Sequence, residues 1–232
     1  MLKVERIDAF YGPAQALHGL SLQARSGEIL CLLGRNGAGK TTALRAIMGL
    51  TPPRAGTVTL DGAPLHGLPP HEIPRRGVGY VPQGRRLFAE LTVAENLEIG
   101  LMTRGMGAAT RERVLDLFPR LRDRLRQRAG TLSGGEQQML ALGRALCVEP
   151  RVILLDEPTE GLQPSMIALI RDIVVRLRGE GAAIVLVEQR VDAVLQIADR
   201  VSFVENGRVV RTLDAAALRA DPDLVHRYVG VG

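Results

Sequence analysis

One eight-residue segment constrains the fold of this chain more than any other. Residues 34–41 read Gly-Arg-Asn-Gly-Ala-Gly-Lys-Thr, which matches the pattern G-x-x-x-x-G-K-[ST]. An apolar run at 28–33 precedes the segment, and a helical pattern at 41–50 follows it. In this order of strand, glycine-rich turn and helix, backbone N–H groups and the helix N-terminus face a bound anion. The segment therefore predicts an α/β fold with a site for nucleotide phosphates.

The use of lysine supports this interpretation. Of 30 basic residues in the 232-residue chain, only Lys3 and Lys40 are lysines. Arginine is a wide planar fork, whereas lysine is a compact charge on a flexible stem. Because a loop wrapped around phosphates has room for the second and not the first, we expect Lys40 to bind phosphate. The alternative is that the arginine bias reflects genome composition and that Lys40 is a chance survivor.

The end of the segment suits both a phosphate and a metal ion. Lys40 would contact the β- and γ-phosphates, Thr41 offers a hydroxyl to Mg²⁺, and Thr42 offers another to a phosphate. A tight turn without a ligand is the alternative. The expected nucleotide-binding residues of this loop are Gly34, Arg35, Asn36, Gly37, Ala38, Gly39, Lys40, Thr41 and Thr42.

Two adjacent carboxylates end a second apolar run. Residues 152–157 read Val-Ile-Leu-Leu-Asp-Glu, and burying a carboxylate at a strand end requires compensation. Asp156 suits the metal ion, directly or through water. Glu157 suits a general base that orients a water molecule. The alternative is a strand-end turn with solvated acids.

The wider pattern predicts an α/β fold with a mainly parallel sheet. Apolar runs of buried-strand type occupy residues 28–33, 78–81, 151–156 and 182–187, and helical patterns lie between them. Residues 1–65 read as strands and turns, which predicts an antiparallel β-subdomain.

The middle of the chain, residues 85–149, is predicted to be a helical insertion. An apolar stripe ends at Phe118, and Pro119 is expected to open a second helix through Leu125. With this insertion, residues 1–232 form one domain, whose nucleotide-binding core consists of 1–84 and 150–232.

Composition indicates a protein without membrane spans. No apolar run reaches the roughly 20 residues that cross a bilayer, and the start of the chain lacks the apolar stretch of a signal peptide. Cys31 and Cys147 lie among apolar neighbours and are expected to be buried thiols.

The net charge is +5, and residues 104–128 hold eight arginines against three acids. We expect these arginines on solvated helix faces, with a surface for a partner or a membrane as the alternative.

Residues 132–138 read Leu-Ser-Gly-Gly-Glu-Gln-Gln and precede a helical pattern. With this string, the loop and the two carboxylates in the right order, the chain resembles the ABC (ATP-binding cassette) ATPases over about residues 4–210. The resemblance implies a P-loop NTPase core of the RecA-like type that binds ATP and Mg²⁺ and hydrolyses ATP. It implies that Gln83 is the Q-loop glutamine, a catalytic residue and a metal ligand beside Thr41 and Asp156. It also implies that Tyr11 stacks on adenine, with a core or edge-strand tyrosine as the alternative.

The same resemblance gives the signature string a mechanism. In the family, this helix N-terminus meets the γ-phosphate held by a second cassette, so that two ATP molecules close a head-to-tail dimer and hydrolysis lets it open. The residues that would make this contact are Ser133, Gly134, Gly135 and Glu136.

Two positions depart from the family pattern. Gln189 stands where the family usually has a switch histidine. Glutamine can hydrogen-bond the γ-phosphate or water but cannot take up a proton, which leaves Glu157 as the expected base. Residues 160–163 read Glu-Gly-Leu-Gln where the family often has S-A-L-D, so Gln163 replaces an aspartate at the dimer contact.

These departures resemble one subgroup, the ATPases of branched-chain amino acid, amide and urea importers. The strings at 158–162, 84–88 and 187–189 carry this likeness. It implies a peripheral protein on the cytoplasmic face of the membrane. Its partners would be transmembrane permease subunits, a second ATPase chain that is either a copy of this one or a different sibling, and, indirectly, a periplasmic or extracellular substrate-binding protein.

Three other functions are weighed against branched-chain amino acid import. The strings at 69–72 and 161–165 lean toward urea or short-amide import. A non-transport ABC ATPase acting on nucleic acid has only the basic segment in its favour, so no nucleic acid partner is expected. A P-loop kinase would leave residues 133–138 unexplained.

Overall fold

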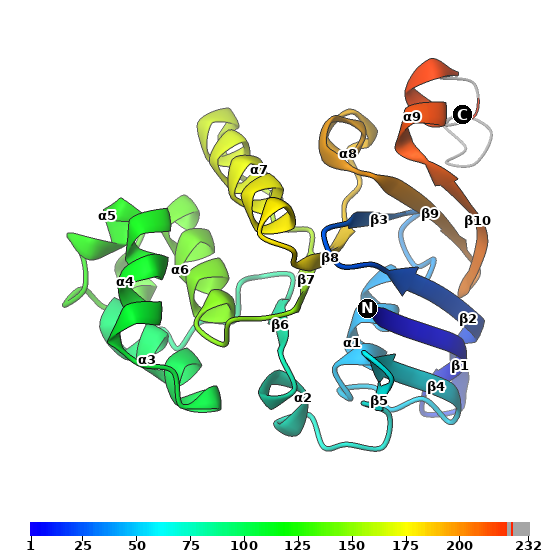
Figure 1. The fold of residues 1–232 in the computed structure, drawn as a ribbon, viewed down its shortest axis with the longest axis horizontal. Coiled ribbons are helices and arrows are strands. Elements are labelled where there is room, and N and C mark those ends of the chain that lie inside the picture. The colour runs from blue at the N-terminus through cyan, green and yellow to red at the C-terminus, as the bar shows by residue number, and fades with distance from the viewer. Residues whose placement is uncertain (222–223, 225–232) are drawn as a thin grey trace.

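The centre of the molecule is a six-stranded sheet with the order β10-β9-β3-β8-β7-β6 (Figure 1). A computed structural model describes residues 1–221 and 224. The strands of this sheet are β3 (Ile29–Leu33), β6 (Val78–Val81), β7 (Val152–Asp156), β8 (Ala183–Val187), β9 (Arg200–Glu205) and β10 (Arg208–Asp214). Neighbouring strands are parallel except for β9 and β10. The four predicted apolar runs are neighbours in this sheet, which confirms the predicted α/β class.

Both faces of the sheet are buried, which explains why its strands are apolar without alternation. In β3, Ile29, Cys31 and Leu33 face one core, and Leu30 and Leu32 face the other. The first core contains the helices of the middle segment and α7 (Pro164–Gly179). The second contains α1 (Lys40–Ile47) and the strands of a second sheet.

The second sheet is antiparallel and has the order β2-β1-β4-β5. Its strands are β1 (Leu2–Tyr11), β2 (Ala14–Ala24), β4 (Ala55–Leu60) and β5 (Ala63–Pro64). A turn joins β4 to β5, and there Asp61 and Gly62 have φ angles of 49° and 82°. This sheet and α1 lie on the same side of the molecule in Figure 1, where α1 begins at the predicted loop.

The middle segment is helical, as predicted, and forms a separate group at the left of Figure 1. The group contains α3 (Val93–Arg104), α4 (Ala108–Leu117), α5 (Pro119–Arg122), η1 (Ala129–Thr131) and α6 (Gly134–Leu146). The other helices are α2 (Glu72–Arg75), α8 (Val191–Ile197) and α9 (Ala215–Ala220). Cys147 follows α6, and both it and Cys31 are buried free thiols, as predicted.

One predicted helix of this group is shorter than expected. Pro119 does open a helix, but α5 ends at Arg122, and Leu125 lies outside it. The carbonyl oxygen of Leu125 instead accepts a hydrogen bond from the N–H of Ala94, in the first turn of α3, at 3.0 Å. The first N–H groups of a helix have no partner within the helix. Residues 123–126 therefore form turns after α5 instead of continuing the helix, and the carbonyl oxygen of Leu125 satisfies part of the N-terminus of α3.

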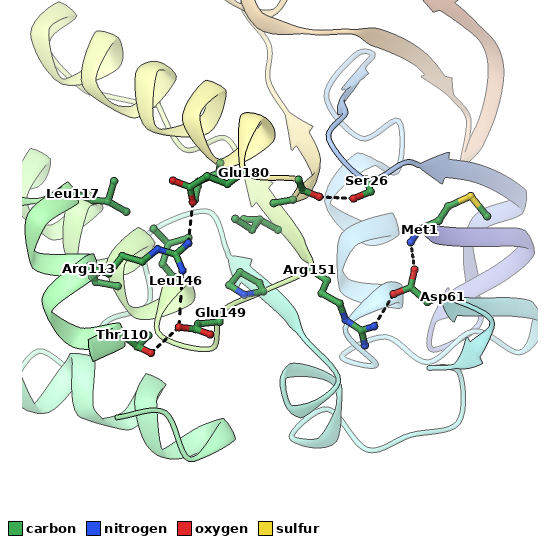
Figure 2. Close-up of a pocket in the computed structure, with 16 residues that line it drawn as sticks. Met1, Ser26, Asp61, Thr110, Arg113, Leu117, Leu146, Glu149, Arg151 and Glu180 are labelled. Atoms are coloured by element: carbon green, nitrogen blue, oxygen red, sulfur yellow. Dashed lines mark hydrogen bonds and ion pairs between the residues drawn. The ribbon is translucent and has the colours of Figure 1, made fainter. Parts of the chain in front are cut away.

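A cavity of about 260 Å³ lies between the helical group and the sheets (Figure 2). Arg113 of α4 donates to Glu180 at 2.9 Å, and Arg151 donates to Asp61 at 2.7 Å. All four side chains are more than one third exposed, so each pair contributes at most about 1 kcal/mol. Gly181, which also lines the cavity, precedes β8. The cavity therefore lies near the amino ends of the parallel strands, away from the predicted loop.

Because α3 packs closely against α6, adding one methyl group at Gly100 is expected to lower the stability of the fold. A Cβ atom on Gly100 would lie 2.5 Å from the carbonyl oxygen of Arg144 and 2.8 Å from the Cβ of Cys147. We expect Gly100→Ala to lower the free energy of unfolding by about 1–3 kcal/mol, because the helices must separate. Urea denaturation of the purified protein measures this loss.

The matched control is Gly179→Ala at the end of α7, where a Cβ would meet no atom within 4 Å. Alanine there is expected to be neutral or to stabilise by up to about 1 kcal/mol. Equal unfolding midpoints for the two variants would contradict the close approach of α3 and α6.

Candidate active site

The predicted loop joins the carboxyl end of β3 to the first residue of α1. Gly39 has a φ of 107°, which residues with a side chain rarely adopt. A Cβ on Gly34 would overlap the carbonyl oxygen of Val204 in the neighbouring strand β9. The loop is therefore fixed by glycines on both sides of a turn that leads into a helix N-terminus, where backbone N–H groups attract anions.

Lys40 folds back over this loop. Its Nζ donates to the carbonyl oxygens of Gly34 at 2.7 Å and Arg35 at 3.0 Å, and its side chain is buried. Burial lowers the pKa of Lys40, although Glu157 and Asp156 act in the opposite direction. The ammonium group thus lies in a place where an anion would stabilise its charge.

Thr41 and Asp156, the residues expected at a metal ion, lie within hydrogen-bond distance of each other. The Thr41 hydroxyl donates to Oδ1 of Asp156 at 3.0 Å. The second oxygen, Oδ2, is buried and has no hydrogen-bond partner among the described residues. Burial raises the pKa of Asp156, and the Thr41 hydroxyl partly offsets this. A buried carboxylate oxygen without a partner is costly, and this one fits a bound cation or its water ligand.

Glu157 is held between two side-chain amides. Gln189 donates to its Oε1 at 2.8 Å, and Gln83 approaches its Oε2 at 3.3 Å. Gln83 follows β6 and Gln189 follows β8, the two neighbours of β7. Glu157 itself has a φ of 49°, a strained backbone for a residue other than glycine. The structure thus brings together the three residues predicted to be catalytic.

A fourth side chain, Glu160, joins this cluster. Its carboxylate accepts a hydrogen bond from Gln83 at 3.0 Å, so one amide serves two acids. In the sequence, Glu160 stands out only as part of the string at residues 160–163 that departs from S-A-L-D. Nothing in its spacing indicates a contact with a residue 77 positions away.

Tyr11 lies at the end of β1 beside the first turn of α1. Its hydroxyl is 3.4 Å from the Thr42 hydroxyl, and the residue is 48% exposed. The aromatic side chain therefore lies at the rim of the loop and not in the core, and its strand β1 lies between β2 and β4 and not at a sheet edge.

The signature residues begin α6, in the helical group. Ser133 is the N-cap, and its hydroxyl accepts from the N–H of Glu136 while the Glu136 carboxylate accepts from the N–H of Ser133. This is a capping box, and the spacing S-x-x-E could have revealed it in the sequence. Gly134 and Gly135 follow the cap, where helix N–H groups lack intrahelical partners.

Several arginines of the basic segment are paired within the chain. Arg122 binds Glu112 at 2.6 Å and Asp116 at 2.8 Å, and Arg124 lies 2.7 Å from Glu136. The Arg104 guanidinium donates to two backbone carbonyl oxygens. These contacts favour the solvated helix surface over a dedicated anionic partner.

The profile of the family described as ABC transporter matches residues 17–160, more than half of the chain. The chain belongs to the ABC transporter family. It is an ABC ATPase, with a P-loop NTPase fold.

Relatives of this ABC ATPase support the same family over its whole length. It is 45% identical to the high-affinity branched-chain amino acid transport ATP-binding protein BraG of Pseudomonas aeruginosa, over 99% of this chain and 100% of BraG. It is 39% identical to the probable branched-chain amino acid transport ATP-binding protein LivF of Archaeoglobus fulgidus, over 90% of each chain.

Solved structures of ABC cassettes have the same fold. A cassette of an ABC transporter in its ADP conformation matches with a TM-score of 0.85 and 27% identity, over 99% of this chain and 98% of that one. A dimeric cassette in a post-hydrolysis state with ADP and Pi matches with a TM-score of 0.81 and 27% identity, over 93% and 99%. Among the described residues of this ABC ATPase, no helix has the length and apolarity to cross a membrane.

Proposed function

We propose that this ABC ATPase binds MgATP between two copies of the chain and powers import of branched-chain amino acids or related small amides. The observation that carries the proposal is 45% identity to BraG along the full length of both proteins. The clustering of Gln83, Glu157 and Gln189 beside the phosphate loop supports hydrolysis as the source of power.

ATP phosphates would bind residues 34–42. Lys40 would exchange the carbonyl oxygens of Gly34 and Arg35 for β- and γ-phosphate oxygens, which relieves the unfavourable burial of its charge. The half-exposed Tyr11 would stack on adenine at the rim of the loop.

The residues present fit Mg²⁺. Hard cations prefer oxygen ligands, and Thr41 offers a hydroxyl next to the unpaired Oδ2 of Asp156. Gln83 would supply a further ligand through its amide oxygen, since its nitrogen is already directed at carboxylates. When bound, Mg²⁺ neutralises charge on the β- and γ-phosphates.

Glu157 would act as the general base. Its carboxylate accepts a proton or hydrogen bond from the attacking water, and the amides of Gln83 and Gln189 fix the two oxygens in place. Gln189 donates a hydrogen bond to this carboxylate at 2.8 Å and cannot compete for the proton.

The signature residues would complete the site of a second copy. Ser133 and the N–H groups of Gly134 and Gly135 form a helix N-terminus suited to phosphate. We propose that ATP closes two cassettes head to tail and that hydrolysis lets them open. The dimeric relative with ADP and Pi supports this arrangement.

Residues 85–149 would form a unit that contacts transmembrane permease subunits at the cytoplasmic face of the membrane. In this unit Phe88 is 50% exposed and Met102 is 71% exposed. Exposed large apolar side chains are typical of protein contacts. A substrate-binding protein outside the membrane would select the transported molecule.

Uptake by the complete transporter tests the proposal. The chain is co-expressed with its permease subunits and substrate-binding protein, and vesicles containing the complex are loaded with MgATP. We expect ATP-dependent uptake of radiolabelled leucine, valine or isoleucine above that of urea and acetamide.

Uptake of urea or acetamide alone would move the assignment to an amide importer. Absence of uptake together with salt-sensitive binding of the purified chain to DNA or RNA would contradict the transport function.

A further inference from the structure

The signature of this chain places a carboxylate beside a phosphate-binding helix N-terminus. Glu136, the fourth residue of Ser-Gly-Gly-Glu, is 8% exposed. Its Oε2 accepts from the N–H of Ser133 at 2.9 Å and from the Ser133 hydroxyl at 2.8 Å. The Ser133 hydroxyl, mainly, and the nearby Arg124 guanidinium lower the pKa of Glu136, against the effect of burial. The carboxylate is therefore ionised at neutral pH.

An ionised Glu136 opposes the function proposed for Ser133 in two ways. A carboxylate only accepts hydrogen bonds, so it holds the single hydroxyl proton that Ser133 would donate to a phosphate oxygen. It also places a negative charge within one helical turn of an incoming anion. Both effects become larger when two cassettes close and water is excluded, because the local dielectric constant falls.

Arg124 lies where it can weaken both effects, the hold on the Ser133 hydroxyl proton and the negative charge near the incoming phosphate. Its Nε is 2.7 Å from Oε1 of Glu136, the oxygen that does not accept from Ser133. Its Nη1 donates to Gln127 at 3.0 Å, and Gln127 in turn donates to the Thr131 hydroxyl at 3.0 Å. The guanidinium is thus held in place, through Gln127, by a hydrogen bond to the segment that leads into the signature helix.

The backbone of that segment is fixed independently of the ion pair. The carbonyl oxygens of Leu125 and Gln127 accept hydrogen bonds from the first turn of α3, at 3.0 Å from Ala94 N and 2.9 Å from Val93 N. The turns at residues 123–126, where the sequence predicts a longer helix, place Arg124 beside Glu136. The contact therefore depends on the fold and not on spacing along one helix.

We propose that Arg124 is a positioning residue for ATP-driven closure. Its guanidinium neutralises Glu136 and weakens the hold of that carboxylate on the Ser133 hydroxyl, so that Ser133 and the helix N–H groups can bind the phosphate of the second copy. This inference rests on the proposed function, because it requires that a second cassette presents ATP to the signature helix. Under this proposal, Arg124 is one arginine of the basic segment that contributes to nucleotide-driven closure.

ATP-driven association of the Glu157→Gln protein, which should accumulate as a closed dimer, tests the inference. We expect Arg124→Gln in this background to raise the monomer–dimer Kd in saturating MgATP at least about tenfold, measured by analytical ultracentrifugation. Arg126→Gln is the matched control. Arg126 is exposed, lies two residues further along and carries the same charge, and its removal should change the Kd less than about threefold.

A second substitution separates charge balance from simple structural support. If Arg124 acts by neutralising Glu136, Glu136→Gln should restore association of Arg124→Gln to within about threefold of the parent, because no charge then remains to balance. Association of Arg124→Gln should also recover with added salt, whereas that of the double variant should not. ATP affinity of the separated cassette should stay within about twofold, since residues 34–42 bind that nucleotide.

Three results would overturn the inference. Equal dimer Kd values for Arg124→Gln and Arg126→Gln would show that the arginine has no special role. A double variant as weak as Arg124→Gln would show that Arg124 acts through packing and not through Glu136. If the Glu157→Gln parent binds ATP but does not dimerise, the proposed dimer itself fails, and the inference fails with it.

Discussion

The Glu157→Gln variant is expected to bind ATP with wild-type affinity and to hydrolyse it about a hundred to ten thousand times more slowly. The amide cannot accept a proton from water as the carboxylate can. The variant also disturbs its surroundings, since Gln83 and Gln189 both donate to Glu157. A glutamine has one acceptor oxygen for these two donors, so one of the two hydrogen bonds is lost.

Steady-state phosphate release measures the loss of hydrolysis, and sedimentation in MgATP measures the accumulation of closed dimer. The control is Glu180→Gln, which removes a carboxylate from the cavity of Figure 2, away from the loop. Its turnover should stay within about twofold of wild type. Wild-type turnover by Glu157→Gln would show that another group activates the water.

The Lys40→Ala variant is expected to bind ATP about a hundredfold more weakly or worse, because truncating one partner of a buried charged contact costs several kcal/mol. Without nucleotide the variant should be no less stable than wild type. Burial lowers the pKa of Lys40, which means that its charge is held at a cost until an anion arrives.

Thermal unfolding with and without MgATP separates these two effects. Wild-type protein should show a rise in Tm with ATP that follows the affinity, and Lys40→Ala should show none at the same concentration. Lys3→Ala is the matched control, because Lys3 is the only other lysine and forms an exposed ion pair with Glu5. An undiminished ATP-dependent Tm shift in Lys40→Ala would contradict phosphate binding by this residue.

The sequence alone predicts the sheet well and the helix ends less well. The central strands are apolar on both faces, so their patterns are strong and their existence is clear. The spacing of Leu125 from Leu121 predicts a helix, but the carbonyl oxygen of Leu125 accepts a hydrogen bond from the first turn of α3 instead. Such a contact joins residues far apart along the chain, and local periodicity carries no information about it.

In the active site too, some residues can be predicted from the sequence and other contacts cannot. Motif spacing identifies Lys40, Asp156 and Glu157 because their chemistry depends on a loop and a strand end. The pairs Gln83–Glu160 and Arg124–Glu136 link separate elements, and only the folded chain reveals them. The capping box of Ser133 lies between these two cases. Its S-x-x-E spacing can be recognised in the sequence, but only the structure shows that the Ser133 hydroxyl donates its proton to Glu136.

The burial of both cysteines has a practical consequence for following this ATPase in action. Cys31 and Cys147 are inaccessible, and burial raises the thiol pKa of each, that of Cys147 to about 12. Neither presents a reactive thiolate at neutral pH. A cysteine introduced in place of the exposed Val210 of β10, outside the unit proposed to contact the permease, would therefore be the sole site for a maleimide dye. Energy transfer between two such dyes could report each opening and closing of single transporters in an otherwise natural sequence.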